Sequence, residues 1–129
     1  MSELPADLAC FLRGELEPAT FTHREHVRMA FEMLRRYDFP EAALYYSRAL
    51  QSLTARAGVP GKFHQTITVA FLSLLAERMS GHDAQTFEAF ALAHPDVLDG
   101  SVLERLYRPE RLASAAARTT FLLPTTLAG

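Results

Sequence analysis

The segment from residue 63 to residue 79, FHQTITVAFLSLLAERM, constrains the fold more than any other part of the sequence. Apolar side chains between residues 67 and 76 cover nearly the whole circumference of a helix, and Gly81 then provides a natural stop. This apolar run is roughly half the length that a membrane-spanning helix needs. It predicts instead a helix at the centre of a bundle, enclosed by the rest of the chain.

The flanking sequence supplies the other helices of such a bundle. Apolar residues recur every three or four positions, and no run alternates apolar and polar residues with the period of two that half-buried strands require. The pattern predicts an all-α fold of about five to seven helices in a single domain that covers residues 1–129. Besides the central helix, we expect helices over residues 5–16, 22–37, 40–57 and 84–93, with short ones beginning at residues 101 and 109.

Local signals set several of these boundaries. The sequences THRE at 22–25 and SVLE at 101–104 match the capping box, in which a hydroxyl and a carboxylate satisfy free N–H groups at a helix start. Pro40 and Pro109 suit a first helical turn, and Gly58 suits a helix end. The predicted helices are therefore separated by short connections.

Composition and charge exclude several classes of partner. With 13 basic against 15 acidic residues, the chain has a formal net charge of −2 and no excess positive charge to attract nucleic acid or an anionic membrane. Its first residues lack the basic stretch and apolar run of a secretory signal. The lone Cys10 lies on an apolar helical stripe and is expected to be a buried structural thiol. We expect a soluble, cytoplasmic protein with no nucleic-acid or membrane partner.

Two histidines at the start of the 22–37 helix are the first candidate functional residues. His23 and His26, in FTHREHV, are three positions apart, which places their Cβ atoms roughly 5–6 Å from each other on one helix face. The same face continues through Val27 and Ala30. Both imidazoles are therefore expected to point inward.

A third histidine, His64, stands at the start of the central helix, on the stripe that leads to Ile67 and Phe71. If the helices over 22–37, 40–57 and 63–79 run up, down and up, the first and third begin at the same end of the bundle. Because the helices are of similar length, the three histidines would gather there at nearly one level. On the helix between them only one of the adjacent Tyr45 and Tyr46 can face the core, where its default role is packing and the alternative is that its hydroxyl lines the pocket.

Such a cluster permits three kinds of chemistry. The partial positive charge at a helix N-terminus favours neutral imidazoles, which bind metal ions and accept protons near pH 7. Three histidines with an open fourth position suit a catalytic zinc ion or another divalent metal. Without a metal, free N–H groups flanked by Arg24 and Lys62 would hold a small-molecule carboxylate or phosphate. The predicted site is thus a metal-assisted or acid–base centre in which His23, His26 and His64 are the catalytic and metal-binding residues.

The motif itself does not separate a functional role from a structural one. HREH lacks the spacing of the zinc-protease motif, and the chain has no Glu-x-x-His pair, no GxSxG sequence and no glycine-rich phosphate loop. The alternative is a non-catalytic helical binding or interaction module whose histidines are structural. An enzyme should present an open pocket at the histidines, whereas an interaction module should bury them and expose an apolar patch.

Structural roles are expected for the remaining polar residues of interest. His82 is interpreted as a loop histidine, and His94 as a residue at the negative end of the 84–93 helix. Arg78 and Arg118 are expected either to extend their charged ends to solvent or to pair with carboxylates such as those of Glu77 and Asp96.

Three segments together resemble a family of small bacterial all-helical proteins: FTHREHV, KFHQTITVAFLSLLAERM and YRPERLASAAARTTFLLP. The similarity covers residues 21–124. The implied family pattern includes these positions: His23, His26, His64, Thr66, Ser114, Ala117 and Arg118. Phe63 stands where the family has tyrosine, and His94 where it has asparagine. The resemblance supports grouping the three histidines, and it implies no particular reaction.

Overall fold

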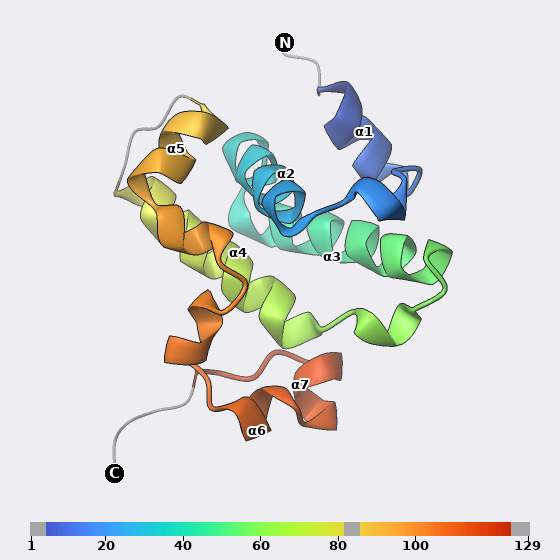
Figure 1. The fold of residues 1–129 in the computed structure, drawn as a ribbon, viewed down its shortest axis with the longest axis vertical. Coiled ribbons are helices and arrows are strands. Elements are labelled where there is room, and N and C mark those ends of the chain that lie inside the picture. The colour runs from blue at the N-terminus through green and yellow to red at the C-terminus, as the bar shows by residue number, and fades with distance from the viewer. Residues whose placement is uncertain (1–4, 82–85, 125–129) are drawn as a thin grey trace.

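The computed structural model describes residues 5–81 and 86–124, which form seven α-helices joined by short 3-10 segments (Figure 1). The α-helices are α1 (Ala6–Leu12), α2 (His23–Arg36), α3 (Phe39–Arg56), α4 (Gln65–Ser80), α5 (Phe87–Ala93), α6 (Pro109–Leu112) and α7 (Ala115–Thr119). The 3-10 segments are η1 (Pro18–Thr20), η2 (Pro60–Lys62), η3 (Pro95–Leu98) and η4 (Val102–Arg105). These ranges contain no strand, so the predicted all-α class is confirmed. None of their helices is both long enough and apolar enough to cross a membrane.

The apolar helix α4 is central to the packing, as its sequence predicts. It contacts α2, α3, α7 and η4, and in Figure 1 α6 and α7 lie below its first turn while α5 lies near its end. One cluster of buried apolar side chains extends from α1 to the residues after η4 and includes Leu8, Phe11, Val27, Phe31, Leu72, Leu75, Phe90, Val97, Leu103 and Tyr107. Burying these side chains is the main favourable term that holds the helices together.

The two predicted capping boxes have different outcomes. At the start of α2 the Thr22 hydroxyl accepts a hydrogen bond from the Glu25 N–H at 3.3 Å, but the Glu25 carboxylate pairs with Arg28, so only half of the box forms. The predicted box at 101–104 is wrong. Ser101 donates its hydroxyl to Asp99 at 2.9 Å, and a 3-10 segment follows instead of an α-helix.

Several other boundaries differ from the sequence prediction. The expected helix from residue 109 is divided into α6 and α7 because Ser114 starts α7 as its N-cap, accepting from the Ala117 N–H at 3.2 Å. The first helix ends at Leu12, and Gly14 then adopts a positive φ of 72° that redirects the chain. The helix expected over 84–93 corresponds to α5, which begins at Phe87 after its N-cap Thr86. Residues 84 and 85 lie outside the described ranges.

The C-terminal part of the chain docks on the start of α4. The Thr66 hydroxyl donates to the Thr120 carbonyl at 2.8 Å and accepts from the Leu122 N–H at 3.1 Å. Ala117 is completely buried, and Arg118 donates to the Gly61 carbonyl at 2.7 Å rather than to the predicted carboxylate. Three positions of the resembled family pattern therefore hold α7 and residues 120–122 in place.

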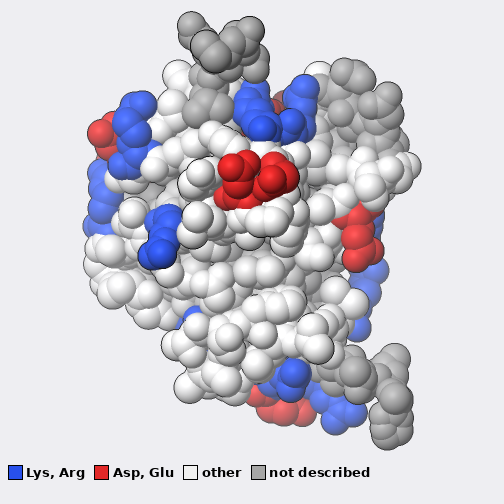
Figure 2. All heavy atoms as spheres, turned by 180° about the vertical axis from the view of Figure 1, so that it is seen from behind, with Lys and Arg blue, Asp and Glu red and all other residues white. Residues whose placement is uncertain are grey.

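Charged side chains are dispersed on the face shown in Figure 2. Lysine and arginine form small groups there, with acidic and uncharged residues between them. This face therefore has no continuous basic surface of the kind that binds polyanions.

The cap on α2 can be tested by substitution. Thr22→Ala removes the acceptor for the Glu25 N–H and should lower the free energy of unfolding by roughly 0.5–2 kcal/mol, measured by urea denaturation. Thr22→Ser keeps the hydroxyl and should stay close to the wild type. Equal stability of all three proteins would show that the cap contributes nothing.

Candidate functional site

A pocket of about 260 Å³ contains all three predicted histidines. We call it the histidine pocket. It lies between α3 and α4, next to the start of α2 and the segment around η4, and is lined by His23, His26, Tyr46, Leu50, Leu53, Thr54, Lys62, Phe63, His64, Ile67, Thr68, Phe71, Gly100 and Leu103. The structure thus brings together histidines from two helix starts that are about 40 positions apart in the sequence.

His23 and His26 form a pair in the first turn of α2. Their ring centroids are 6.3 Å apart, and both side chains are partly exposed. The Nε2 atom of His23 lies 3.3 Å from the Val97 carbonyl oxygen. Because a carbonyl only accepts, Nε2 carries the proton in this contact, and the Nδ1 atom of the neutral ring is an acceptor. The pair therefore presents a defined polar end to a ligand.

His26 is held neutral by its surroundings. Burial, together with a smaller effect of the nearby His23, lowers its pKa from 6.5 to about 4. The Phe21 ring lies 4.3 Å from the imidazole, centroid to centroid, and the hydroxyl of the buried Tyr46 donates to the His26 carbonyl at 3.0 Å. Within residues 5–81 and 86–124, neither ring nitrogen of His26 has a hydrogen-bond partner. One donor and one acceptor are thus available to a bound molecule.

His64 has a different role from the predicted one. It is the N-cap of α4 rather than a first-turn residue, and its Nδ1 accepts from the Ile67 N–H at 3.1 Å. Its Nε2–H donates to the Leu112 carbonyl at 2.7 Å. Both nitrogens are therefore occupied, and the imidazole connects the start of the central helix to the end of α6.

The three histidines are also not at one level, contrary to the sequence prediction. His23 lies against Phe71, with 5.7 Å between ring centroids, and Phe71 is seven positions after His64. Seven residues correspond to about 10 Å along a helix axis. Helices α2 and α4 are therefore staggered, so that His64 is at one end of the pocket and the His23–His26 pair is at the other.

These contacts do not support the predicted zinc site. Zinc binds an imidazole through a nitrogen lone pair, but the His64 lone pair accepts from Ile67, and the other nitrogen carries the proton for Leu112. In the described part of the chain, no group of three or more His, Cys, Asp or Glu residues is arranged to hold a metal ion. The predicted anion site keeps only one of its two cations. Lys62 lines the pocket, but Arg24 does not, because its Cζ atom lies over the Phe87 ring, 5.1 Å from the ring centroid.

An ion pair supports the wall beside His23. Arg78 donates to both oxygens of Asp96 at 2.9 and 2.7 Å, which confirms the predicted partner and lowers the pKa of Asp96 to about 2. Arg78 also lies 3.3 Å from Nδ1 of His94. The pair ties η3 to α4, and the residue after Asp96, Val97, supplies the carbonyl that accepts the hydrogen bond from His23.

The other histidine interpreted from the sequence, His82, lies outside the described residues.

The apolar wall of the pocket was not predicted as part of a site. Leu50 and Leu53 of α3 and Leu103 of η4 line the cavity. Their spacing in the sequence is that of ordinary core residues, so no local signal distinguishes a pocket wall from a filled core. Only the placement of η4 shows that this part of the interior is left open.

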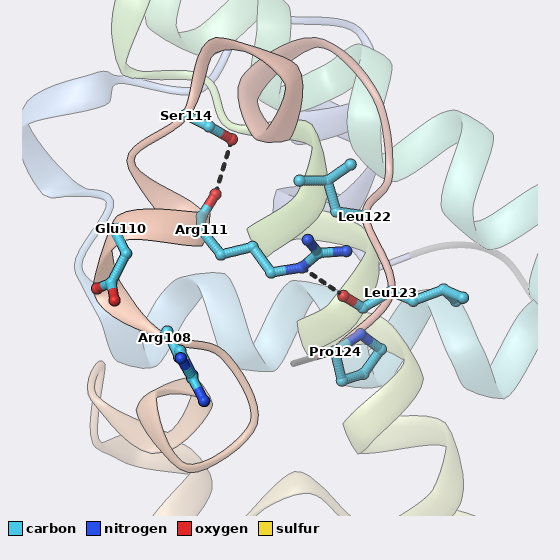
Figure 3. Close-up of a pocket in the computed structure, with 7 residues that line it drawn as sticks. All are labelled: Arg108, Glu110, Arg111, Ser114, Leu122, Leu123 and Pro124. Carbon is cyan, nitrogen blue, oxygen red and sulfur yellow. Dashed lines mark hydrogen bonds between the residues drawn. The ribbon is translucent and has the colours of Figure 1, made fainter. Parts of the chain in front are cut away.

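A larger pocket, of about 580 Å³, lies between α6 and residues 122–124 (Figure 3). Arg111 donates its Nε–H to the Leu123 carbonyl at 2.9 Å, and Ser114 donates to the Arg111 carbonyl at 2.8 Å. These polar groups hold the C-terminal segment against α6. The histidine pocket is the stronger candidate because the His26 ring nitrogens remain available.

Comparison of the chain with models of protein families, with curated proteins and with solved structures gives no match. The resemblance to a family of small bacterial helical proteins therefore stays a prediction. No activity or ligand is transferred from another protein, and the function is argued from the pocket.

The low pKa of His26 predicts a specific loss of stability in acid. As the pH falls below 6.5, the unfolded chain takes up a proton at this histidine while the folded chain does not until about pH 4. The free energy of unfolding should fall over this range by on the order of 3 kcal/mol. His26→Gln should remove that part of the pH dependence in urea denaturation at pH 7, 5.5 and 4.5. Parallel pH profiles for both proteins would contradict the neutral, buried imidazole.

The two hydrogen bonds of His64 can be separated. His64→Asn keeps an acceptor for the Ile67 N–H but is too short to reach Leu112, so it should lose roughly 0.5–1.5 kcal/mol of stability. His64→Ala also removes the cap and should lose a further 0.5–2 kcal/mol, roughly, in the same denaturation assay. If the two variants are equally stable, the cap is not formed by this side chain.

Proposed function

We propose that this protein binds a small, largely apolar molecule in the histidine pocket. The observation that carries the proposal is His26, a neutral imidazole in a partly open cavity with both ring nitrogens free of partners in the described part of the chain. These nitrogens are not fully buried, so a ligand that bonds them replaces solvent and gains hydrogen bonds at the wall of a mainly apolar cavity. Apolar side chains such as Leu50 and Leu53 then bury the body of the ligand.

In this proposal, His23 and His26 hold the polar group of the ligand. A hydroxyl or carbonyl group placed between the two rings would receive hydrogen bonds from them or donate to them. The pKa of about 4 makes His26 a weak base at neutral pH, so a role in orienting the ligand is better supported than a role in proton transfer. Under this proposal His64 is a positioning residue, since its nitrogens are already used.

The interaction module kept as an alternative in the sequence analysis is less well supported. Such a module would bury the histidines, whereas His23 and His26 are partly exposed and line a cavity. The cytoplasmic location stays a prediction from the sequence.

Filling the pocket provides a direct test. Ile67 lines it and is 39% exposed, so Ile67→Trp should occupy the cavity without disrupting the core. Small apolar alcohols, ketones and acids would be screened by NMR of the histidine rings. We expect compounds that shift the His23 and His26 signals in the wild type and leave them unchanged in Ile67→Trp.

Leu106→Trp is the matched control, since Leu106 is also 39% exposed but does not line the pocket. It should bind like the wild type. The proposal fails if no compound perturbs the two rings, or if binding persists when the cavity is filled.

A further inference from the structure

Lys62 is the only lysine, arginine, aspartate or glutamate among the residues that line the histidine pocket. It is the last residue of η2, is exposed, and forms no ion pair in the described part of the chain. Because no carboxylate lines the pocket, the positive charge of Lys62 is not neutralised there. One end of the cavity therefore attracts an anion.

The two ends of the pocket differ in chemistry. Lys62 and His64 lie at the start of α4, and the His64 nitrogens are taken, which leaves the ammonium group as the free donor at that end. His23 lies beside Phe71, about 10 Å further along the helix. Between the ends, the wall is mainly apolar, with Leu50, Leu53, Phe63 and Ile67.

A fixed negative charge stands near the His23 end. The carboxylate of Asp99 accepts from the N–H of Ser101 at 3.0 Å and from its hydroxyl at 2.9 Å, next to Gly100, which lines the pocket. These bonds keep Asp99 ionised and lower its pKa. This exposed carboxylate lies outside the pocket lining and interacts with His23, not with Lys62, so the Lys62 end is the one that favours a ligand anion.

We infer, on the basis of the proposed small-molecule site, that the ligand is an apolar monocarboxylic acid with a hydroxyl or carbonyl group at its far end. The carboxylate pairs with Lys62, the chain lies along the apolar wall, and the far polar group lies between His23 and His26. A monoanion matches the single available cation. A phosphate would bring a larger charge than one lysine neutralises.

The test uses 8-hydroxyoctanoate and 1,8-octanediol, which differ only at the end that would meet Lys62. Binding would be measured by NMR titration at pH 7 with the wild type, Lys62→Gln and Lys62→Arg. We expect the wild type to bind the acid about two- to five-fold more tightly than the diol, as for a partly exposed ion pair. Lys62→Gln should abolish this preference, Lys62→Arg should keep it, and 0.5 M salt should weaken it.

Three outcomes would overturn the inference, and they separate its failure from failure of the proposed function. If acid and diol bind equally and Lys62→Gln changes nothing, while both still shift the His23 and His26 rings, the carboxylate assignment is overturned and the binding site stands. If neither compound binds, the assignment is overturned as well, and the site itself is judged by the screen with Ile67→Trp. A preference for the acid that Lys62→Gln leaves intact would place the anion elsewhere and also overturn it.

Discussion

The imidazole of His64 is the contact on which the arrangement around the pocket depends. It closes the first turn of α4 through Nδ1 and binds the end of α6 through Nε2, so one ring satisfies a free N–H at a helix start and a carbonyl at a helix end. Because α4 contacts α2, α3, α7 and η4, fixing its start also helps to fix where the C-terminal segment lies. Loss of this ring would remove both connections at once.

The C-terminal segment completes this end of the molecule through contacts of the same kind. Thr66 exchanges two hydrogen bonds with the backbone of residues 120 and 122, and Arg118 binds the carbonyl of Gly61 in η2. Most of these bonds join a side chain to a backbone group, so they specify position rather than contribute much net stability. Their consequence is that η2 is held where Lys62 lines the pocket.

The histidines of the pocket show how environment divides one residue type into different roles. His64 has protein partners for both nitrogens and acts as a structural connection. His26 is half-buried beside the rings of Phe21 and His23 and lacks such partners within the described residues, so it stays neutral and available to a ligand. His23 is intermediate, with one nitrogen bound to Val97. The His23–His26 pair at one end of the cavity and the positively charged Lys62 at the other would orient a bound ligand and favour one that carries a negative charge.

The sequence by itself determined the all-α class, the central position of α4, the cap at Thr22 and the inward direction of the three histidines. These features follow from periodicity and from residues within one turn of each other, which local physics controls. The tertiary structure alone decided the stagger of α2 against α4 and the partner of His64 at Leu112. Both join segments that are tens of residues apart. Side-chain spacing could therefore predict that the histidines share a pocket, but not which of them are free to bind a ligand.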